Sequence, residues 1–438
     1  MLNPGVKKSE VFGWAMYDFA NSGYTTVVIT AVFAAYFVGA VAQQAEWATL
    51  AWTSALSFSY AIVMVTMPAL GEWADRHAAK KKLLMAVTAG CVLTTAALAW
   101  VGPGQVALAV VCIVLSNAFF SYGESLTAAF LPELATPQAM GRVSAWGWAW
   151  GYLGGMLTLG LCLAYVLWAQ GQGQPASQFV PVTMMLTAVI YALSACFTFV
   201  LMKEHAQPQE ARVKASGQWQ QLKQTFNEAK AYPDFIQLLA CAVAYQAGVA
   251  VAITLAAIYA EQVIGFQPQE TMMLIFVLNI AALVGSLILG YMQDKVGHKL
   301  ALSITLVGWS LTCIMAALTT TKDMFWWAAT LAGICMGSSQ SIGRAMAGLL
   351  MPKARVAEYF GLWTFATRLA SIVGPLGYGL ITWATNGNQR WAIAATTLLF
   401  VLGWILLWPV NVERGRAKAG NFDQASQSQD HVVETANG

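Results

Sequence analysis

The chain has 438 residues, of which 58% are hydrophobic and only 10% are charged, with a formal net charge of +3. Soluble domains carry about 25% charged residues, so this composition excludes ordinary cytosolic enzymes, secreted disulfide scaffolds and nucleic-acid-binding proteins. A transmembrane helix needs about 20 apolar residues, and the length leaves room for about twelve such helices with their loops. We therefore expect an all-α membrane protein.

Apolar stretches separated by polar connections predict twelve transmembrane helices. The first six are expected at 11–41, 50–70, 82–101, 105–131, 143–169 and 179–202. The last six are expected at 233–260, 270–291, 299–319, 325–350, 359–384 and 391–411. The first stretch contains Asp18 and Asn21 and is longer than the apolar core of a signal peptide, so we interpret it as a span and not as a cleaved leader.

The longest connection, 203–232, lies at the midpoint of the chain. It divides the sequence into an N-terminal six-helix bundle, 1–202, and a C-terminal six-helix bundle, 233–411. We interpret the connection as a cytoplasmic linker between the two bundles.

Two segments outside the bundles differ in composition from the predicted spans. In the linker, Trp219, Leu222 and Phe226 have the spacing of a short helix that lies in the membrane interface. A solvated linker with scattered apolar residues is the alternative. The final segment, 412–438, becomes polar and poor in apolar residues from Asn421 onward, which predicts a disordered cytoplasmic tail.

The lysines and arginines of the predicted loops favour one orientation. All but four of the 23 basic residues fall on the side of the membrane that holds the N-terminus. Of these four, Lys322 and Arg390 lie in loops on the opposite side, and Arg344 and Arg368 lie within spans. Because basic loops stay on the cytoplasmic side, we expect both termini in the cytoplasm and a multi-pass protein of the cell (inner) membrane.

The two predicted bundles repeat a short motif. Gly71–Asp75 and Gly290–Asp294 have the same spacing and stand 219 residues apart, and Pro132 and Pro352 stand 220 apart. Parallel six-helix repeats are a transporter architecture, with the substrate site at the repeat interface near the middle of the membrane. We therefore expect two pseudo-symmetric bundles with a site between them.

Several motifs resemble those of a known transporter superfamily. The segments Gly71–Arg76, with Lys80–Lys82, and Gly290–Lys299 resemble the two loop signatures of the major facilitator superfamily. Further blocks resemble its vacuole-effluxer-like (autophagy-related amino-acid effluxer) branch, and they are Gly13–Ser22, Phe130–Leu134, Gly147–Gly155, and Gln340, Ser341 and Arg344 with Glu358–Gly361. The resemblance implies a bacterial member with the major facilitator fold. Eukaryotic relatives are held to release amino acids from the vacuole, whereas bacterial relatives mostly have no assigned substrate.

The chain departs from this branch in the seventh span. Relatives often carry an acidic residue before the glycine there, whereas this sequence reads Tyr245-Gln246-Ala247-Gly248. Any role of that acid must be absent or moved in this protein.

Four ionisable residues fall within the predicted spans: Asp18, Glu124, Arg344 and Arg368. Each costs at least about 2.5 to 3.5 kcal/mol in a bilayer, so each needs a partner or a water-filled cavity. Arginine can hold a carboxylate bidentately and an acid can hold an ammonium, so two acids and two arginines suit a zwitterionic substrate. Asp18 and Glu124 are also the candidates for proton carriage, although Asp18 can instead be a permanently paired packing residue.

Glu124 and Arg344 occupy the same position in the two repeats, because each lies eight residues before its proline. The repeat symmetry predicts that they lie at the same depth and approach each other across the cavity. A purely structural salt bridge between them is the alternative to a substrate contact.

Neutral polar residues on neighbouring spans can orient a substrate by hydrogen bonds. The candidates are Asn21, Asn117, Tyr122, Tyr245, Gln246, Asn279 and Gln340. For each of them, a contact between two helices is the alternative.

The repeated motifs predict a gate. Asp75 and Asp294 stand near helix ends, where a carboxylate can accept backbone N–H groups or pair with a cation, and the neighbouring glycines let two helices approach. By resemblance we assign to a cytoplasmic gate Gly71, Asp75, Arg76, Glu133, Arg142, Gly290, Asp294, Gly297 and Lys299. For Lys80, Lys81 and Lys82, a topogenic role as loop charges is the alternative.

These features favour a secondary active transporter, coupled to protons, of a small polar or zwitterionic metabolite such as an amino acid. A proton-driven exporter of amphipathic compounds is the alternative within transport, because many aromatic residues are present, including Trp146, Trp148, Trp326, Trp327 and Trp363. Belts of tryptophan at membrane interfaces are the commoner cause of that pattern. A membrane-embedded sensor or channel with the same fold also stays open.

The spans contain no histidine, no paired metal ligands and no phosphate-binding glycine loop. We therefore expect no enzymatic activity, no cofactor and no metal ion. The expected partners are the lipid bilayer, a small-molecule substrate and protons but no nucleic acid, and the expected state is a monomer.

Overall fold

The computed structural model describes residues 1–45, 47–206 and 218–420. The first bundle contains α1 (Lys8–Tyr24), continued by η1 (Thr25–Ala31), α2 (Phe33–Tyr36) and η2 (Phe37–Val41), and then α3 (Ala48–Arg76), α4 (Lys80–Ala97), α5 (Val106–Leu134), α6 (Met140–Gly171) and α7 (Ala176–Leu201). The second contains α9 (Pro233–Tyr259), extended by η5 (Ala260–Ile264), and then α10 (Pro268–Val296), α11 (His298–Leu318), α12 (Lys322–Leu350), α13 (Val356–Ala384) and α14 (Gln389–Leu407). The helix α8 (Gln218–Ala229) lies between them in sequence.

The predicted twelve-helix architecture is confirmed. In the described part of the chain, ten of the long helical segments have the length and mean hydropathy of a membrane span. The other two are α12 and α13, of 29 residues each, which carry Arg344 and Arg368. Polar residues and glycines within these two helices, the two arginines among them, weaken their apolar signal.

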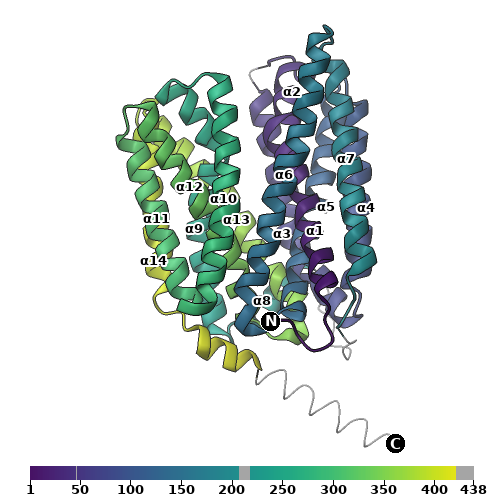
Figure 1. The fold of residues 1–438 in the computed structure, drawn as a ribbon, viewed down its shortest axis with the longest axis vertical. Helices are drawn as coiled ribbons and strands as arrows, with labels where there is room; N and C mark the ends of the chain where they lie inside the picture. Colours follow the sequence, from purple (N-terminus) through teal and green to yellow (C-terminus); the bar gives the residue numbers. More distant parts are fainter. Residues whose placement is uncertain (46, 207–217, 421–438) are drawn as a thin grey trace, which may run out of the picture.

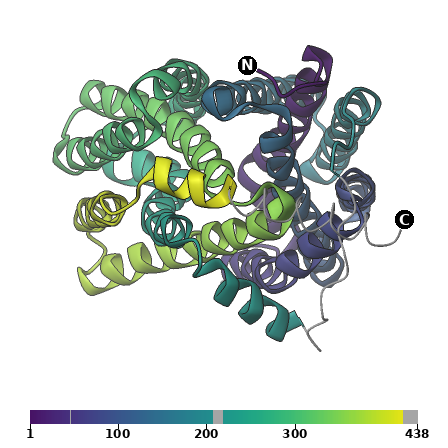
Figure 2. The same ribbon diagram turned by 90° about the horizontal axis from the view of Figure 1, so that it is seen from below.

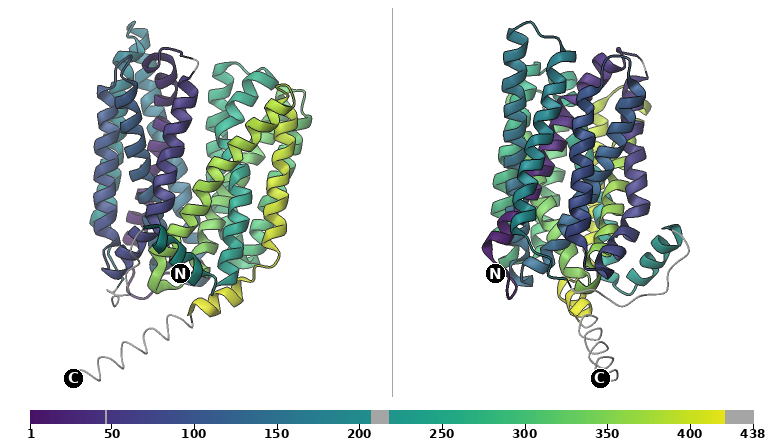
Figure 3. Two further views of the ribbon diagram at one scale, coloured as in Figure 1. Left: turned by 180° about the vertical axis from the view of Figure 1, so that it is seen from behind. Right: turned by 90° about the vertical axis from the view of Figure 1, so that its right-hand side faces the viewer.

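The two bundles lie side by side (Figure 1), with α3 packed against α13 and α10 packed against α6 across the boundary. The N-terminus and the helical residues 412–420 lie at the same end of the molecule, which we call the termini end (Figures 1 and 3). Figure 2 views the molecule from this end. The opposite end is called the distal end.

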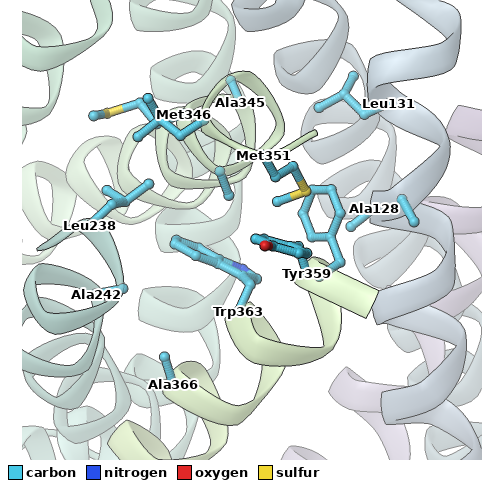
Figure 4. Close-up of a cluster of buried hydrophobic side chains, with 14 of the residues drawn as sticks. Ala128, Leu131, Leu238, Ala242, Ala345, Met346, Met351, Tyr359, Trp363 and Ala366 are labelled. Carbon is cyan, nitrogen blue, oxygen red and sulfur yellow. The ribbon is translucent and has the colours of Figure 1, made fainter. Parts of the chain in front are cut away.

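The buried side chains show which end is closed. One large cluster, partly drawn in Figure 4, combines residues of both bundles, such as Ala128 and Leu131 of α5 with Leu238 of α9 and Tyr359 of α13. Two smaller clusters belong to one bundle each, the first around Tyr24 and the second around Tyr259. The bundles therefore share a packed core toward the termini end and have separate cores toward the distal end.

The segments outside the bundles are partly as predicted. The predicted linker helix exists as α8, which packs against α3 and α13, with Thr225 and Ala229 buried. Leu222 is partly buried and Phe226 is exposed, while the side chain of Trp219 and residues 207–217 lie outside the described part.

The predicted disordered tail is wrong for residues 412–420, which are helical. Arg414 holds this helix to the start of α9 through an ion pair with Asp234 of 2.6 Å. Residues 421–438 lie outside the described part. The sequence did not predict this contact, because the segment is polar and the partner of Arg414 lies far away in sequence.

Candidate functional site

An ion pair joins the two bundles between Asp18 of α1 and Arg344 of α12. The distance from Arg344 Nη1 to Asp18 Oδ2 is 2.7 Å. Arg344 stands six residues before the end of α12 and Asp18 ten residues after the start of α1. At 1.5 Å per residue, both lie about 9 to 15 Å inside the termini end of their helices. The pair therefore lies about two to three helical turns inside the termini end of these helices.

Other groups of the first bundle also contact the guanidinium of Arg344. Its Nε donates to Ser144 Oγ (3.2 Å) and its Nη2 donates to the backbone oxygen of Ser144 (2.8 Å). The rings of Trp14 and Trp148 lie over the guanidinium, with centroids at 4.7 and 5.3 Å. A Cβ at Gly147 would lie 2.3 Å from Asp18 Oδ2, so only glycine leaves room for the pair. The first bundle thus encloses this arginine of the second bundle.

A second ion pair joins Glu124 of α5 to Arg368 of α13. The guanidinium of Arg368 lies over the rings of Tyr60 and Phe120, at 5.1 and 5.9 Å from their centroids. The side chain of Glu124 is 40% exposed, against 13% for Asp18. Both pairs combine an acid of the first bundle with an arginine of the second.

The predicted pairing of Glu124 with Arg344 is wrong. The two residues stand at equivalent positions of the repeat. Their helices, however, face different helices of the opposite bundle. Helix α5 faces α13 of the other bundle, so Glu124 meets Arg368. Helix α12 faces α6 and lies beside α1, so Arg344 meets Ser144 and Asp18. Equal depth therefore does not bring the two side chains together.

The neutral polar candidates divide into two groups. Three of them bond within the first bundle: Tyr191 donates to Asn21 (2.5 Å), Asn117 donates to Ser59, and Tyr122 bonds Thr66 (2.6 Å). In the second bundle, Gln246 and Gln340 exchange two amide hydrogen bonds, of 2.8 and 3.3 Å, with the hydroxyl of Tyr245 at 3.5 Å from Gln246. Asn279 bonds the backbone of its own helix. Gln340 of the amide pair lies one helical turn from Arg344, and Asn21 lies one turn from Asp18.

The repeated motifs each bind the start of a helix in the other bundle. Asp75 accepts the backbone N–H groups of Ala357 (3.2 Å) and Glu358 (3.0 Å) at the start of α13. Asp294 accepts those of Gly141 and Arg142, both at 3.0 Å, at the start of α6, and also Nε of Arg142 at 3.2 Å. A carboxylate there satisfies free N–H donors and interacts favourably with the helix dipole. The predicted acceptance of backbone N–H groups is confirmed.

The motifs are the last turns of helices, although the sequence pattern indicated loops. Gly71–Asp75 lies inside α3 and Gly290–Asp294 lies inside α10. A Cβ at Gly71 would lie 2.4 Å from the oxygen of Ala357, and one at Gly290 would lie 2.1 Å from the Cβ of Ala145. These glycines therefore permit the two bundles to touch at the termini end.

Lys80 connects Asp75 of α3 to Glu133 near the end of α5. Its side chain is 1% exposed, and its Nζ lies 3.7 Å from Asp75 and in close contact with Glu133. A topogenic loop charge would be exposed, so burial excludes that role alone for Lys80. Lys82 is exposed, so the topogenic role stays open for it.

The other predicted gate residues lie within one bundle. Lys299 donates to the backbone oxygen of Trp408 (2.6 Å), and Gly297 forms the turn between α10 and α11 with a φ of 96°. Arg76 is partly exposed at the end of α3. Among the described residues, these three form no hydrogen bond or ion pair with the other bundle.

The linker helix is tied to the same turn of α13 that Asp75 caps. Thr225 of α8 donates to Glu358 Oε1 (2.7 Å), and Arg355 bonds both Glu358 (2.6 Å) and Glu228 of α8 (2.5 Å). Burial would lower the pKa of Arg355, but the bonds and charges of Glu358 and Glu228 outweigh it and raise this pKa. Nothing in the linker sequence pointed to this contact, because its partners lie about 130 residues away.

Gly71→Ala should open the termini end, because the new methyl group cannot fit beside the backbone of Ala357. The measurement is the rate at which a polar thiol reagent labels a cysteine placed at the buried Ala128, in protein whose exposed Cys196 is replaced by serine. The matched control is Gly160→Ala, since a Cβ there meets no atom within 4 Å. Equal labelling of both variants would contradict the steric role of Gly71.

Comparison with solved structures identifies the fold. The proton:xylose symporter XylE, bound to 6-bromo-6-deoxy-D-glucose, matches 92% of this chain and 95% of its own with a TM-score of 0.72 and 12% identity. The major facilitator superfamily transporter FucP, in the outward conformation, matches 92% of this chain and all of its own with a TM-score of 0.73 and 14% identity. At these identities the likeness shows the fold alone.

Sequence comparison identifies the family. An uncharacterized MFS-type transporter of Bacillus subtilis (strain 168), YxiO, is 28% identical over 405 residues, covering 90% of this chain and 93% of the relative. Autophagy-related protein 22 of Candida glabrata is 33% identical over 87 residues, which are 20% of this chain and 16% of that protein. The family model described as vacuole effluxer Atg22 like matches residues 48–420. The chain therefore belongs to the Atg22-like vacuole effluxer family of major facilitator superfamily transporters.

Proposed function

We propose that this transporter is a proton-coupled secondary carrier of a small polar or zwitterionic metabolite, with an amino acid as the best candidate. The observation that carries the proposal is the pair of acid–arginine contacts between the bundles, Asp18 with Arg344 and Glu124 with Arg368. Buried charges in a membrane are expensive and mark substrate or ion pathways. An arginine binds a substrate carboxylate and a carboxylate binds an ammonium or a proton, so the site matches the groups of an amino acid.

The arrangement of the cores supports alternating access. The shared core and the caps at Asp75 and Asp294 hold the termini end closed, while the cores are separate toward the distal end. Rocking of two rigid bundles about a central site exposes that site to one side at a time. We propose that the caps act as a gate that breaks when the termini end opens.

Asp18 and Glu124 are the proposed proton carriers. Protonation of either acid removes the charge that holds its arginine, so uptake of a proton weakens one contact between the bundles. At the pair that the substrate reaches, a substrate carboxylate can then replace the protonated acid as the partner of the arginine. Proton and substrate binding are coupled in this scheme because they act on the same ion pair.

Export of amphipathic compounds has less support. Of the tryptophans that suggested it, Trp327 is exposed, and Trp363 is packed in the shared core. Trp146 is exposed and donates a hydrogen bond to Tyr291 of the other bundle. Exposed tryptophans of this kind fit an interfacial belt. Trp148 contacts the guanidinium of Arg344 and is therefore part of the candidate site.

We also propose that the termini end is cytoplasmic, on the distribution of basic residues. A reporter fused after Gly438 should then be active inside the cell. Cysteines placed at Gln172 and Asn386, which follow α6 and α13 at the distal end, should react with an impermeant reagent added outside. Labelling of these positions only in inverted vesicles would reverse the orientation.

A thermal-shift screen of the purified protein against amino acids, peptides, sugars and organic acids would identify the substrate. A ligand at 100 times its dissociation constant stabilises by about 2.7 kcal/mol, which is readily measured. Counterflow of the labelled hit in liposomes then separates a carrier from a channel or a sensor. Absence of counterflow with every stabilising ligand would refute the proposed function.

A further inference from the structure

The two arginines between the bundles differ in how completely their donors are used. Arg344 has acceptors at Asp18, at Ser144 Oγ and at the backbone of Ser144, and tryptophans cover its faces. Its side chain is 7% exposed. A guanidinium has five N–H donors in a fixed plane, and three of those of Arg344 have acceptors on the first bundle. A ligand could reach this buried side chain only by displacing those groups.

Arg368 has one acceptor in the structure, the carboxylate of Glu124. Its Nε is buried and has no hydrogen-bond partner. A buried donor without an acceptor costs about 1 to 3 kcal/mol, so a ligand that supplies a second oxygen gains that energy. This arginine is therefore incompletely satisfied by the protein.

The counter-ion of Arg368 is also the more accessible acid. The side chain of Glu124 is 40% exposed and lies beside the other bundle, whereas Asp18 is 13% exposed and is held under Gly147. An exposed carboxylate loses little when it leaves an arginine, because water can solvate it again. Glu124 can be displaced at much lower cost than Asp18.

We infer that Arg368 is the residue that binds the carboxylate of the substrate, with Glu124 occupying that position while the site is empty. The aromatic rings of Tyr60 and Phe120 hold the guanidinium in place. The pair Asp18 and Arg344 does not touch the substrate and acts as a strut between the bundles. This assignment rests on the proposed function, because it specifies which of the two ion pairs is the substrate site.

The experiment uses acetate as a probe of a vacant carboxylate position. Glu124→Ala and Asp18→Ala each remove one carboxylate, and thermal unfolding of the full chain is followed in sodium acetate and in sodium chloride of equal ionic strength. In Glu124→Ala, acetate at ten times its dissociation constant should raise the folding equilibrium constant about elevenfold above chloride. The effect should vanish in Glu124→Ala with Arg368→Gln, and Asp18→Ala should respond to acetate no more than to chloride.

An equal response of the two single variants, or no response of Glu124→Ala, would overturn the inference. If Glu124→Ala does not fold, the unmodified protein is treated with a water-soluble carbodiimide and glycine ethyl ester. Mass spectrometry of the peptides should then show Glu124 modified several-fold faster than Asp18. Equal rates at the two acids would overturn the inference as well.

Transport distinguishes a failure of the inference from a failure of the proposed function. If the protein exchanges a carboxylate-bearing substrate, Arg368→Lys should raise KM several-fold, while the conservative change Ser144→Ala beside Arg344 should leave KM unchanged. An unchanged KM in Arg368→Lys would refute the inference and leave the proposed function standing. Counterflow of uncharged substrates alone would refute the inference and leave a carrier of a small polar metabolite standing. Absence of counterflow with every stabilising ligand would refute the proposed function, whatever the acetate experiment shows about Arg368.

Discussion

Asp18→Asn should lower the free energy of unfolding by about 3 to 5 kcal/mol. That is the usual loss when one partner of a buried ion pair is removed and the other charge stays buried. Arg344 cannot escape the loss by deprotonation, because arginine keeps its proton in proteins. It cannot turn to water either, since Trp14 and Trp148 cover it. Thermal or denaturant unfolding of the purified variant measures the effect.

A double-mutant cycle separates the observed pairing from the one that the repeat symmetry predicted. Asp18→Asn and Arg344→Gln should show a strong interaction energy, because the two side chains are in contact. Glu124→Gln and Arg344→Gln should be nearly additive, since Glu124 contacts Arg368 instead. The reverse pattern, with coupling only in the second cycle, would contradict the structure.

Lys80→Met should be the most damaging single change at the gate, with a loss of at least about 3 to 5 kcal/mol. The substitution keeps the length of the side chain and removes the one charge between Asp75 and Glu133. Two carboxylates would then repel each other in a buried position. Acidification, which neutralises carboxylates, should restore part of the lost stability, so the deficit should be larger at pH 8 than at pH 5.

Lys82→Met is the matched control for this prediction, because Lys82 lies two residues further along the same helix and is exposed. Its stability should change by no more than about 0.5 kcal/mol. Equal losses in the two variants, or a deficit of Lys80→Met that does not depend on pH, would show that the lysine does not balance the two acids.

The sequence predicted the helices well because a membrane span must be both apolar and long. All twelve spans were predicted within a few residues of an observed helix, except where a helix continued into charged residues. The clearest case is α3, which extends to Arg76 although its apolar stretch ends near Leu70. A hydropathy pattern marks where the bilayer ends and not where the helix ends. Gly71–Asp75 is therefore helical in spite of its charges.

The sequence could identify the charged residues of the site but not their partners. Asp18, Glu124, Arg344 and Arg368 stand out because each is costly within a span. Which acid meets which arginine depends on how the two bundles dock, and no pattern within one helix carries that information. The same reason explains why the contact of Thr225 with Glu358 was not predicted. Repeat symmetry predicted a contact between Glu124 and Arg344, and that prediction is wrong.

The most direct test of the account is accumulation of the identified substrate in liposomes under an imposed pH gradient. The parent protein should accumulate substrate when the gradient is present and only equilibrate it when the gradient is collapsed. Glu124→Gln, which cannot bind or release a proton at this position, should still exchange substrate but should not accumulate it. Accumulation by Glu124→Gln equal to that of the parent, or accumulation by the parent without any gradient, would contradict proton coupling through the ion pair of Glu124 and Arg368.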